Sequence, residues 1–332
     1  MLSRVADSLY WMSRYLERAE HTARLVNVNL NLTLDRSPAD AARNWGRLLA
    51  SLPDPPPWAL PTTTNPGEAT VDLANRASIA ACVGAARENA RQVREEISSE
   101  MWEGINRLHL AAQRSQPEEA EWTASTNEFL TSAIGGAYQF QGLTDATMTH
   151  GEGWHFIELG RYLERASATA ALLDLQFHDA GAAVEQPAQV SEYVEWVGLL
   201  KSCCAFEAYC QHYTADIRPW RIAEFLVLNP EFPRSIHYAA ARMKASLAAV
   251  AGITGRPNTT ADRLAGRLLA SLDYGQLALS ESLGFERRVE GVDEILRDLP
   301  AFLQGIVKQA DAIGAAVHEQ YIAYPIDSRL RA

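Results

Sequence analysis

Apolar residues recur at every third or fourth position along the start of the chain. This spacing matches the turn of an α-helix and predicts one long amphipathic helix from Val5 to about Leu34. The apolar positions are Leu9, Met12, Leu16, Ala19, Ala23, Val26 and Leu30. The opposite face of this helix carries Tyr10, Arg14, Glu17, His21 and Arg24.

The same periodicity continues along the rest of the chain. Ser78 and Ser235 are placed to cap the helices that follow them. The proline-rich segment 53–67 and the segment 229–235 are predicted loops. Strand-like alternation is absent from the sequence, so we predict an all-α protein. The predicted helices cover 37–52, 79–114, 118–148, the stretch from His150–Trp154 to about 177, 190–213, 236–250, 260–283 and 289–321.

Six residues near the start of the chain, Arg14–Ala19, are spelled again 147 positions later as Arg161–Ala166. Further matches keep their order while the shift between the copies grows, as insertions in the second copy would produce. These matches pair Trp45 with Trp196, Ser78–Ile79 with Ser235–Ile236, and Ala133–Ala137 with Ala312–Ala316. We therefore predict a tandem duplication: helical bundles over 1–147 and 148–332, related by a pseudo-twofold axis and forming one compact unit.

The repeated hexapeptide contains an arginine and a glutamate three residues apart. On a helix, Arg14 and Glu17 share a face, as do Arg161 and Glu164, so each pair could form an ion pair. One interpretation is a solvated surface pair in each copy, which would contribute a few tenths of a kcal/mol.

A second interpretation rests on what the two copies have kept. Both retain the pattern Arg-x-x-Glu-Arg, which ends in Arg18 and Arg165, whereas His21 and Arg24 align with alanines. Retention of the charges alone suits a buried charged network or a ligand-binding face, because a buried carboxylate needs its arginine.

A third group of charges lies in the predicted helix 79–114. Arg87, Arg91 and Arg94 follow one another at helical steps and would form a cationic stripe suited to a carboxylate or phosphate. The alternative is an exposed helix whose arginines are balanced by neighbouring glutamates.

Composition and charge exclude several classes of protein. The chain of 332 residues has a formal net charge of −11 with dispersed acidic residues, which argues against nucleic acid and anionic membranes as partners. It has neither a secretory leader nor a stretch of roughly 18 apolar residues, so we predict a cytoplasmic protein. The four cysteines lack CxxC spacing, HExxH is absent, and no metal site is predicted. Motifs of nucleophilic hydrolases and nucleotide-binding loops are also absent from the sequence.

Four sequence blocks together resemble the bacterial alpha-E family. They are Arg14–Ala19, Arg87–Asn106, Gly153–Ala166 and Asn229–Ser235. The resemblance implies an all-helical protein encoded beside, or fused to, a circularly permuted ATP-grasp ligase, often with a transglutaminase-like peptidase. One departure is Asn75–Ser78, where the first copy lacks the proline of Asn-Pro-x-Ser.

The leading hypothesis is an accessory subunit, not catalytic alone, that docks on an ATP-grasp ligase and positions its peptide or amino-acid substrate for amide-bond formation. It implies no cofactor in this chain, with ATP and Mg in the partner ligase. Glu17 and Glu164 would contact an ammonium or a partner arginine. The ligand-binding arginines would be Arg14, Arg18, Arg161, Arg165, Arg87, Arg91 and Arg94.

Two rival hypotheses belong to other classes of protein. In the first, the chain is itself an enzyme in which Glu17 and Glu164 form a general acid/base pair, which requires a shared cavity and a raised pKa. In the second, the chain is a purely structural scaffold, and the repeated charges only fix the register of helices.

Overall fold

The computed structural model describes residues 1–33, 45, 51–52, 78–114, 122–180, 190–214, 216–257, 259–282 and 299–323. Within these residues every regular element is helical, which confirms the predicted all-α class. None of the described helices is both long and apolar enough to cross a membrane. The elements are α1 (Ser3–Thr33), α4 (Ile79–Gln92), α5 (Ser99–Arg114), α6 (Trp122–Thr147), α7 (Glu152–Ala180), α8 (Val190–Ser202), α9 (Phe206–Tyr213), α10 (Pro219–Leu228), α11 (Ile236–Thr254), α12 (Thr260–Ser282), α14 (Leu299–Val317) and the π-helical turn η2 (His318–Ile322).

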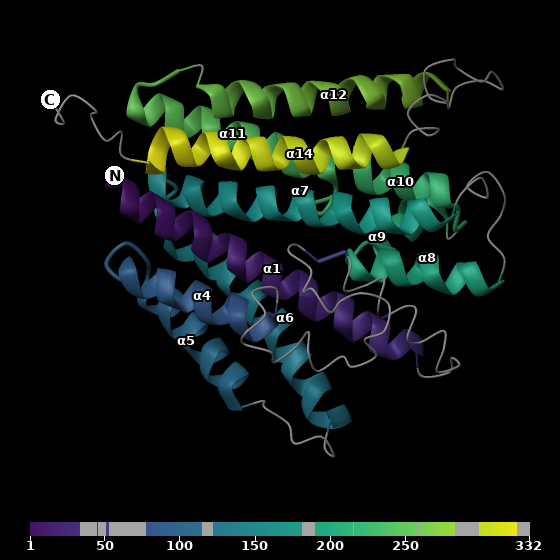
Figure 1. Ribbon diagram of the computed structural model, residues 1–332, viewed down its shortest axis with the longest axis horizontal. Helices are drawn as coiled ribbons and strands as arrows, with labels where there is room; N and C mark the ends of the chain where they lie inside the picture. Colours follow the sequence, from purple (N-terminus) through teal and green to yellow (C-terminus); the bar gives the residue numbers. More distant parts are fainter. Residues whose placement is uncertain are drawn as a thin grey trace, which may run out of the picture.

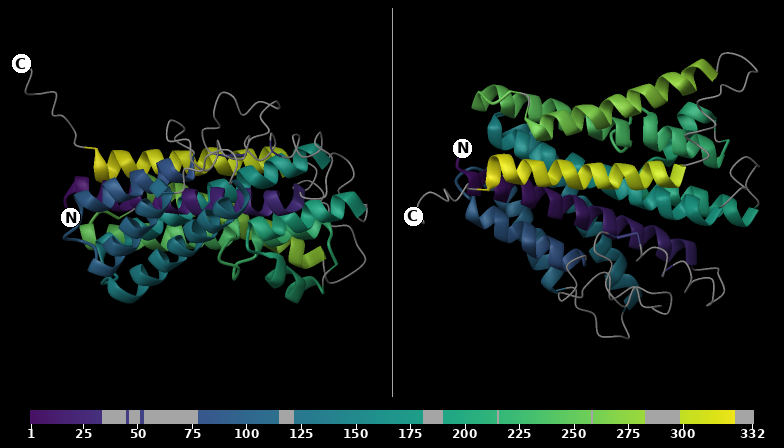
Figure 2. Two further views of the ribbon diagram at one scale, coloured as in Figure 1. Left: turned by 90° about the horizontal axis from the view of Figure 1, so that it is seen from below. Right: turned by 45° about the horizontal axis from the view of Figure 1, so that its top comes forward.

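Two long helices, α1 and α7, pack against each other through the middle of the molecule (Figure 1). Helices α4, α5 and α6 lie on one side of this pair, and α11, α12 and α14 lie on the other (Figure 2). Every residue of α1 from Leu16 to Val26 is buried, as is every residue of α7 from Phe156 to Ala166. The polar face of the first helix therefore does not face solvent but is enclosed by other helices.

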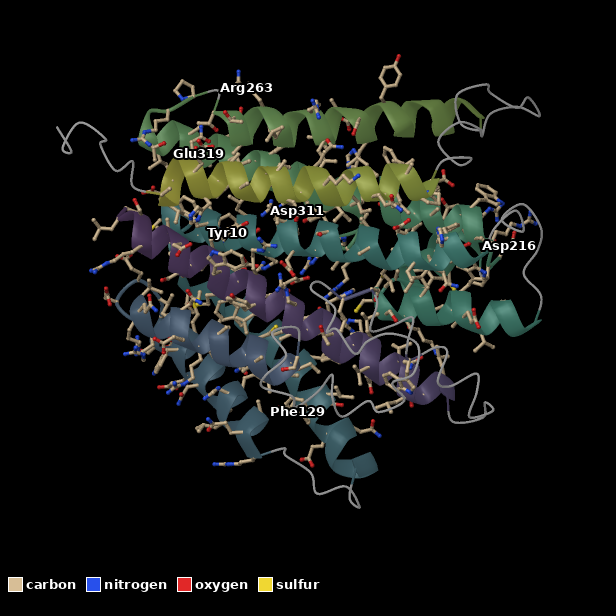
Figure 3. The ribbon with its side chains drawn as sticks, viewed as in Figure 1. Tyr10, Phe129, Asp216, Arg263, Asp311 and Glu319 are labelled. Carbon is tan, nitrogen blue, oxygen red and sulfur yellow. The ribbon has the colours of Figure 1, made fainter. Side chains whose placement is uncertain are left out.

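The close approach of α1 and α7 depends on a glycine. A Cβ atom placed on Gly160 of α7 would lie 2.4 Å from the backbone oxygen of Tyr10, far inside van der Waals contact. Tyr10 lies where α1 meets α7, and its hydroxyl points toward Gly314 of α14 (Figure 3). Residues with a side chain at 160 would push the two central helices apart.

We expect Gly160→Ala to lower the free energy of unfolding by about 1–3 kcal/mol, because the added methyl group meets backbone that has no room to move. Gly142→Ala in α6 is the matched control, since a Cβ there meets nothing within 4 Å. That control should stabilise the protein by about 0.5–1 kcal/mol through helix propensity. Urea unfolding followed by circular dichroism measures both changes, and equal effects at the two glycines would contradict this account of the crossing.

The predicted helix caps are confirmed. The Ser78 hydroxyl accepts a hydrogen bond from the Ala81 backbone N–H at 3.1 Å, and the Ser235 hydroxyl accepts one from Tyr238 at 3.0 Å. The helices predicted to start near residues 5, 236 and 260 are also observed. Helix α6 continues without a break through Gly135 and Gly136.

The predicted helix 79–114 is wrong as a single element. Val93 leaves helical geometry at φ −124° and ψ 33°, and the Ser98 hydroxyl then accepts a hydrogen bond from the Met101 backbone N–H, as an N-cap does. The side chains of Val93 and Ile97 are buried and anchor the turn between α4 and α5. Ser98, a residue type that is unfavourable inside a helix, therefore caps the start of α5.

The predicted helix 190–213 is also two elements. Cys204 adopts a left-handed conformation with φ 51°, and the N–H groups of Cys204 and Ala205 bond back to Lys201 and Leu200. This is a Schellman motif, in which glycine is the usual residue at the left-handed position. Because the left-handed position holds a cysteine and not a glycine, no residue type in the sequence indicated that α8 ends there.

Helix α10 was not predicted; Pro219 occupies its first turn, where a missing N–H costs nothing. Most of the predicted helix 37–52, the proline-rich segment 53–67 and the start of the predicted helix 289–321 lie outside the described residues. The tandem duplication, its pseudo-twofold axis and the division at residue 147 stay predictions.

Candidate functional site

The two copies of the hexapeptide meet where α1 crosses α7, and their ion pairs run between the helices. The Arg165 guanidinium donates from Nε to Glu17 Oε1 at 2.6 Å and from Nη2 to Glu17 Oε2 at 2.9 Å. In return, Arg18 donates from Nε and Nη2 to the Glu164 carboxylate at 2.6 and 3.2 Å. Arg14 Nε also donates to Glu164, at 2.8 Å. The predicted pairing of Arg14 with Glu17 along one helix is therefore wrong.

Further polar groups surround the Glu17 carboxylate. Gln141 of α6 donates to Oε2 at 3.2 Å, and Arg234 lies 3.8 Å from Oε1. Arg234 also pairs with Glu20 at 2.8 Å, and Glu20 pairs in turn with Arg24. The loop before α11 is thus tied to α1 by ion pairs.

A fourth carboxylate, Glu158, lies one turn before the repeated motif on α7. It pairs with Arg161 at 2.7 Å and with Arg242 of α11 at 2.9 Å. We call all of these residues the arginine–glutamate network: Glu17, Glu20, Glu158, Glu164, Arg14, Arg18, Arg24, Arg161, Arg165, Arg234 and Arg242. It holds seven arginines and four glutamates, so it carries excess positive charge inside a chain with a net charge of −11.

Burial and pairing together set the ionisation of the two motif glutamates. Both side chains are only 2% exposed. Burial acts to raise the pKa of Glu17, but Arg165 and Arg234 more than offset it and hold that pKa well below its ordinary value. Burial acts in the same way on Glu164, where Arg14 and Arg18 lower the pKa below its ordinary value. Both carboxylates are therefore ionised, and their oxygens are already bound by arginines.

This arrangement argues against Glu17 and Glu164 as a general acid/base pair. A catalytic carboxyl of that kind needs a pKa raised toward neutrality and access to a substrate proton. Here the pKa of both groups is lowered, and each carboxylate is bound by guanidinium groups of the facing helix. The interpretation as a solvated surface pair is also wrong, because both carboxylates are buried. The buried charged network is observed.

One ring nitrogen of a buried histidine in this region has no hydrogen-bond partner among the described residues. His21 is 5% exposed, and its Nε2 atom makes no hydrogen bond. Burial and the nearby Arg234 charge lower the pKa of His21 to about 4. The imidazole is therefore neutral at physiological pH, and protonating it would place another cation beside the network.

The predicted cationic stripe is split by the turn between α4 and α5. Arg91 is exposed and pairs with Glu88 at 2.7 Å, and Arg94 lies beyond the end of α4. Arg87 donates to the Asn106 side chain at 2.7 Å, and the guanidinium carbons of Arg87 and Arg94 lie 5.6 and 5.8 Å from the Trp102 ring centre. The three arginines therefore do not form one continuous helical face. Whether they or the motif residues bind a ligand stays a prediction.

Five network residues were not predicted as site residues from the sequence: Glu20, Arg24, Glu158, Arg234 and Arg242. Two of them lie inside the sequence blocks quoted above, since Glu158 precedes the second hexapeptide by a few residues and Arg234 precedes the capping Ser235. Their position inside these blocks was the sequence feature that could have identified Glu158 and Arg234. Across the part of the chain that the structure describes, no three His, Cys, Asp or Glu side chains are grouped to hold a metal ion.

Comparisons with known proteins support a family assignment. A family model described as Alpha-E, a predicted alpha-helical domain with a conserved ER motif, matches residues 1–322. Uncharacterized proteins of Mycobacterium bovis and Mycobacterium tuberculosis are 26% identical over 295 residues, which is 81% of this chain and 32% of theirs. The chain thus spans about a third of the length of the curated relatives it matches. No solved structure matches it. Glu-Arg dipeptides stand at 17–18 and at 164–165, inside the arginine–glutamate network.

Proposed function

The chain belongs to the Alpha-E family, and from that premise we propose that it is a non-catalytic helical module that works with an ATP-grasp ligase in forming amide bonds on a peptide or amino acid. The observation that carries the non-catalytic part is the reciprocal pairing of Glu17 with Arg165 and of Glu164 with Arg18. The glutamates and arginines of the two Glu-Arg dipeptides form ion pairs with each other. Their role is to lock α1 to α7.

The reciprocal pairing also supports the proposed tandem duplication. Each copy of Arg-x-x-Glu-Arg supplies a carboxylate to the other copy's last arginine, which is the pattern that a pseudo-twofold axis between the copies would produce. Under this proposal the two bundles were once identical and paired through the same residues.

The partnership with a ligase is supported by two observations. The family resemblance implies a neighbouring or fused ATP-grasp enzyme, and the mycobacterial relatives carry their matching region as about a third of a longer chain. ATP and Mg would be bound by the ligase. A transglutaminase-like peptidase is the second partner that the resemblance suggests.

Co-expression with the ATP-grasp ligase that the resemblance implies tests the proposal. We expect the two proteins to co-elute on size exclusion, and ADP release coupled to amide formation to require both. The chain alone should convert no substrate. Product formed by the chain without the ligase, or full ligation by the ligase without the chain, would overturn the proposal.

Two variants separate docking from folding. Arg91→Glu changes an exposed side chain, so it can weaken docking on the ligase without disturbing the core. The double variant Glu17→Gln with Glu164→Gln disturbs the core, so its loss of ligation should follow its unfolded fraction as measured by circular dichroism. Complete loss of ligation by a fully folded double variant would instead assign the glutamates to substrate contact.

A further inference from the structure

Two arginines of the first hexapeptide share a single carboxylate. The Nε atoms of Arg14 and Arg18 lie 2.8 and 2.6 Å from the oxygens of Glu164. Neither arginine pairs with another carboxylate in the part of the chain that the structure describes. Glu164 is ionised, and arginine stays protonated in proteins. The group of three side chains therefore carries one positive charge that no other described carboxylate neutralises.

Each of these two arginines has one guanidinium nitrogen that is open to a further partner. Arg14 donates from Nε to Glu164 and from Nη1 to the Tyr10 hydroxyl. Arg18 donates from Nε and Nη2 to Glu164. Arg14 Nη2 and Arg18 Nη1 make no hydrogen bond to a described residue, and neither is a buried atom, so both reach solvent. Their side chains are 14% and 10% exposed.

Two aromatic rings of α1 hold the guanidinium groups in place. The guanidinium carbon of Arg14 lies 4.7 Å from the centre of the Trp11 ring, and that of Arg18 lies 5.9 Å from the centre of the Tyr15 ring. The two rings lie 5.5 Å apart and are both half-buried. A guanidinium that stacks on a ring keeps its N–H groups in its own plane, so they stay available at its edge. The open nitrogens therefore lie beside an apolar surface.

The second hexapeptide does not offer the same accessible donors. Arg161 is the counterpart of Arg14, but it pairs with Glu158 of its own helix and its side chain is only 5% exposed. Its unpaired nitrogen, Nη2, is buried. Helix α1 runs between α14 and α4 in the view of Figure 1, and a Cβ on Gly314 of α14 would lie 3.7 Å from Arg14 Nη1. The accessible donors therefore lie on α1, close to α14.

We propose that Arg14 and Arg18 bind a carboxylate of the peptide or amino-acid substrate. The single excess charge matches the one charge of a carboxylate, whereas a phosphate group would bring about two. The two open N–H groups donate to the carboxylate oxygens as charge-assisted hydrogen bonds. An apolar group next to the carboxylate packs on Trp11 or Tyr15. The inference rests on the proposed function for the class of substrate, and it assigns the contact with that substrate to this chain.

Titration of the full chain with two small probes, followed by ligand-observed NMR, tests the proposal. N-acetylphenylalanine carries a carboxylate near an aromatic ring, and N-acetylphenylalaninamide is the same molecule without the charge. We expect the amide to bind at least about tenfold more weakly, because it loses a charged hydrogen bond. Equal affinity for the two probes, or displacement of the acid by an equal concentration of inorganic phosphate, would overturn the proposal. The ligase is absent from this titration, so its outcome is separate from the co-elution that tests the proposed function.

Two variants of Arg14 locate the bound carboxylate. Arg14→Gln removes the excess charge but leaves Glu164 paired with Arg18, so this variant should fold and should bind the acid at least about tenfold more weakly. Arg14→Lys keeps the charge but lacks the planar guanidinium, so its affinity should lie between those of the parent and Arg14→Gln. Circular dichroism checks the fold of both. Unchanged affinity in folded Arg14→Gln would contradict the proposal, and if that variant does not fold, the comparison of acid and amide on the parent decides.

An exposed group with the same composition provides the matched control. Arg218 and Arg221 share the carboxylate of Asp216, at 2.7 Å each, but the side chains of Arg218 and Asp216 are 46% and 41% exposed. Solvent screens the excess charge there, so Arg218→Gln should leave the affinity for the acid unchanged. An equal loss of affinity in Arg218→Gln and Arg14→Gln would show that the acid responds to the overall charge of the protein, contrary to the proposal.

Discussion

Replacing Glu17 with glutamine should lower the free energy of unfolding by about 3–5 kcal/mol, the usual cost of breaking a buried ion pair by removing one partner. The variant leaves Arg165 buried without a carboxylate and removes one of the two carboxylates beside Arg234, and glutamine returns at most one neutral hydrogen bond. Natural domains are stable by only about 5–15 kcal/mol, so this loss is a large fraction of the total. Urea unfolding followed by circular dichroism measures it.

The exposed pair of Arg91 with Glu88 provides the matched control. Glu88→Gln should change stability by no more than about 1 kcal/mol, because solvent screens that pair. A double-mutant cycle on Glu17 and Arg165 should show strong coupling, since Arg165→Met also removes the charge that Glu17 neutralises. Additive effects in that cycle, or a Glu17→Gln variant as stable as the parent, would contradict the proposal that these ion pairs hold α1 against α7.

Acidification below pH 6.5 should destabilise the protein through His21. The unfolded chain binds a proton at this histidine below its ordinary pKa of 6.5, whereas the folded protein does not until about pH 4. Stability contributed by the neutral imidazole is therefore fully present above pH 6.5 and is lost as the pH falls toward 4. The loss amounts to about 3 kcal/mol over that window.

The His21→Leu variant isolates this contribution. It removes the titrating group and the unpartnered nitrogen, so the difference in unfolding free energy between parent and variant should change with pH only between about 6.5 and 4. The pKa values of His109 and His155 are also lowered by burial, but both histidines remain in the variant, so their contributions cancel in the difference. A difference that stays constant across this window would refute the assignment.

Helix positions were predictable from the sequence wherever apolar periodicity ran without interruption. The first helix, the caps at Ser78 and Ser235, and the all-α class all follow from local rules. Helix ends were less predictable. At Ser98 a capping residue stood inside an apparently continuous pattern, and at Cys204 a cysteine took the place that glycine usually marks.

The partners of the motif charges could not be predicted from spacing. Periodicity shows which residues share a face of one helix, so it pairs Arg14 with Glu17. The choice between that local partner and Glu164 depends on how two helices cross, which is set by features such as the absent side chain at Gly160. The retention of both charges in the two copies did favour a buried network or a ligand-binding face over an exposed pair, because breaking a buried pair costs far more stability than breaking an exposed one.

The crossed pairing of α1 with α7 has a consequence for the protein while it is being made. A nascent chain leaves the ribosome from its N-terminus, so α1 emerges long before the residues that neutralise it. Glu17 is synthesised before its partner Arg165, which lies 148 residues downstream. Its second arginine, Arg234, is synthesised later still. Helix α1 must therefore remain solvated, or be shielded by a chaperone, until Arg234 has been translated.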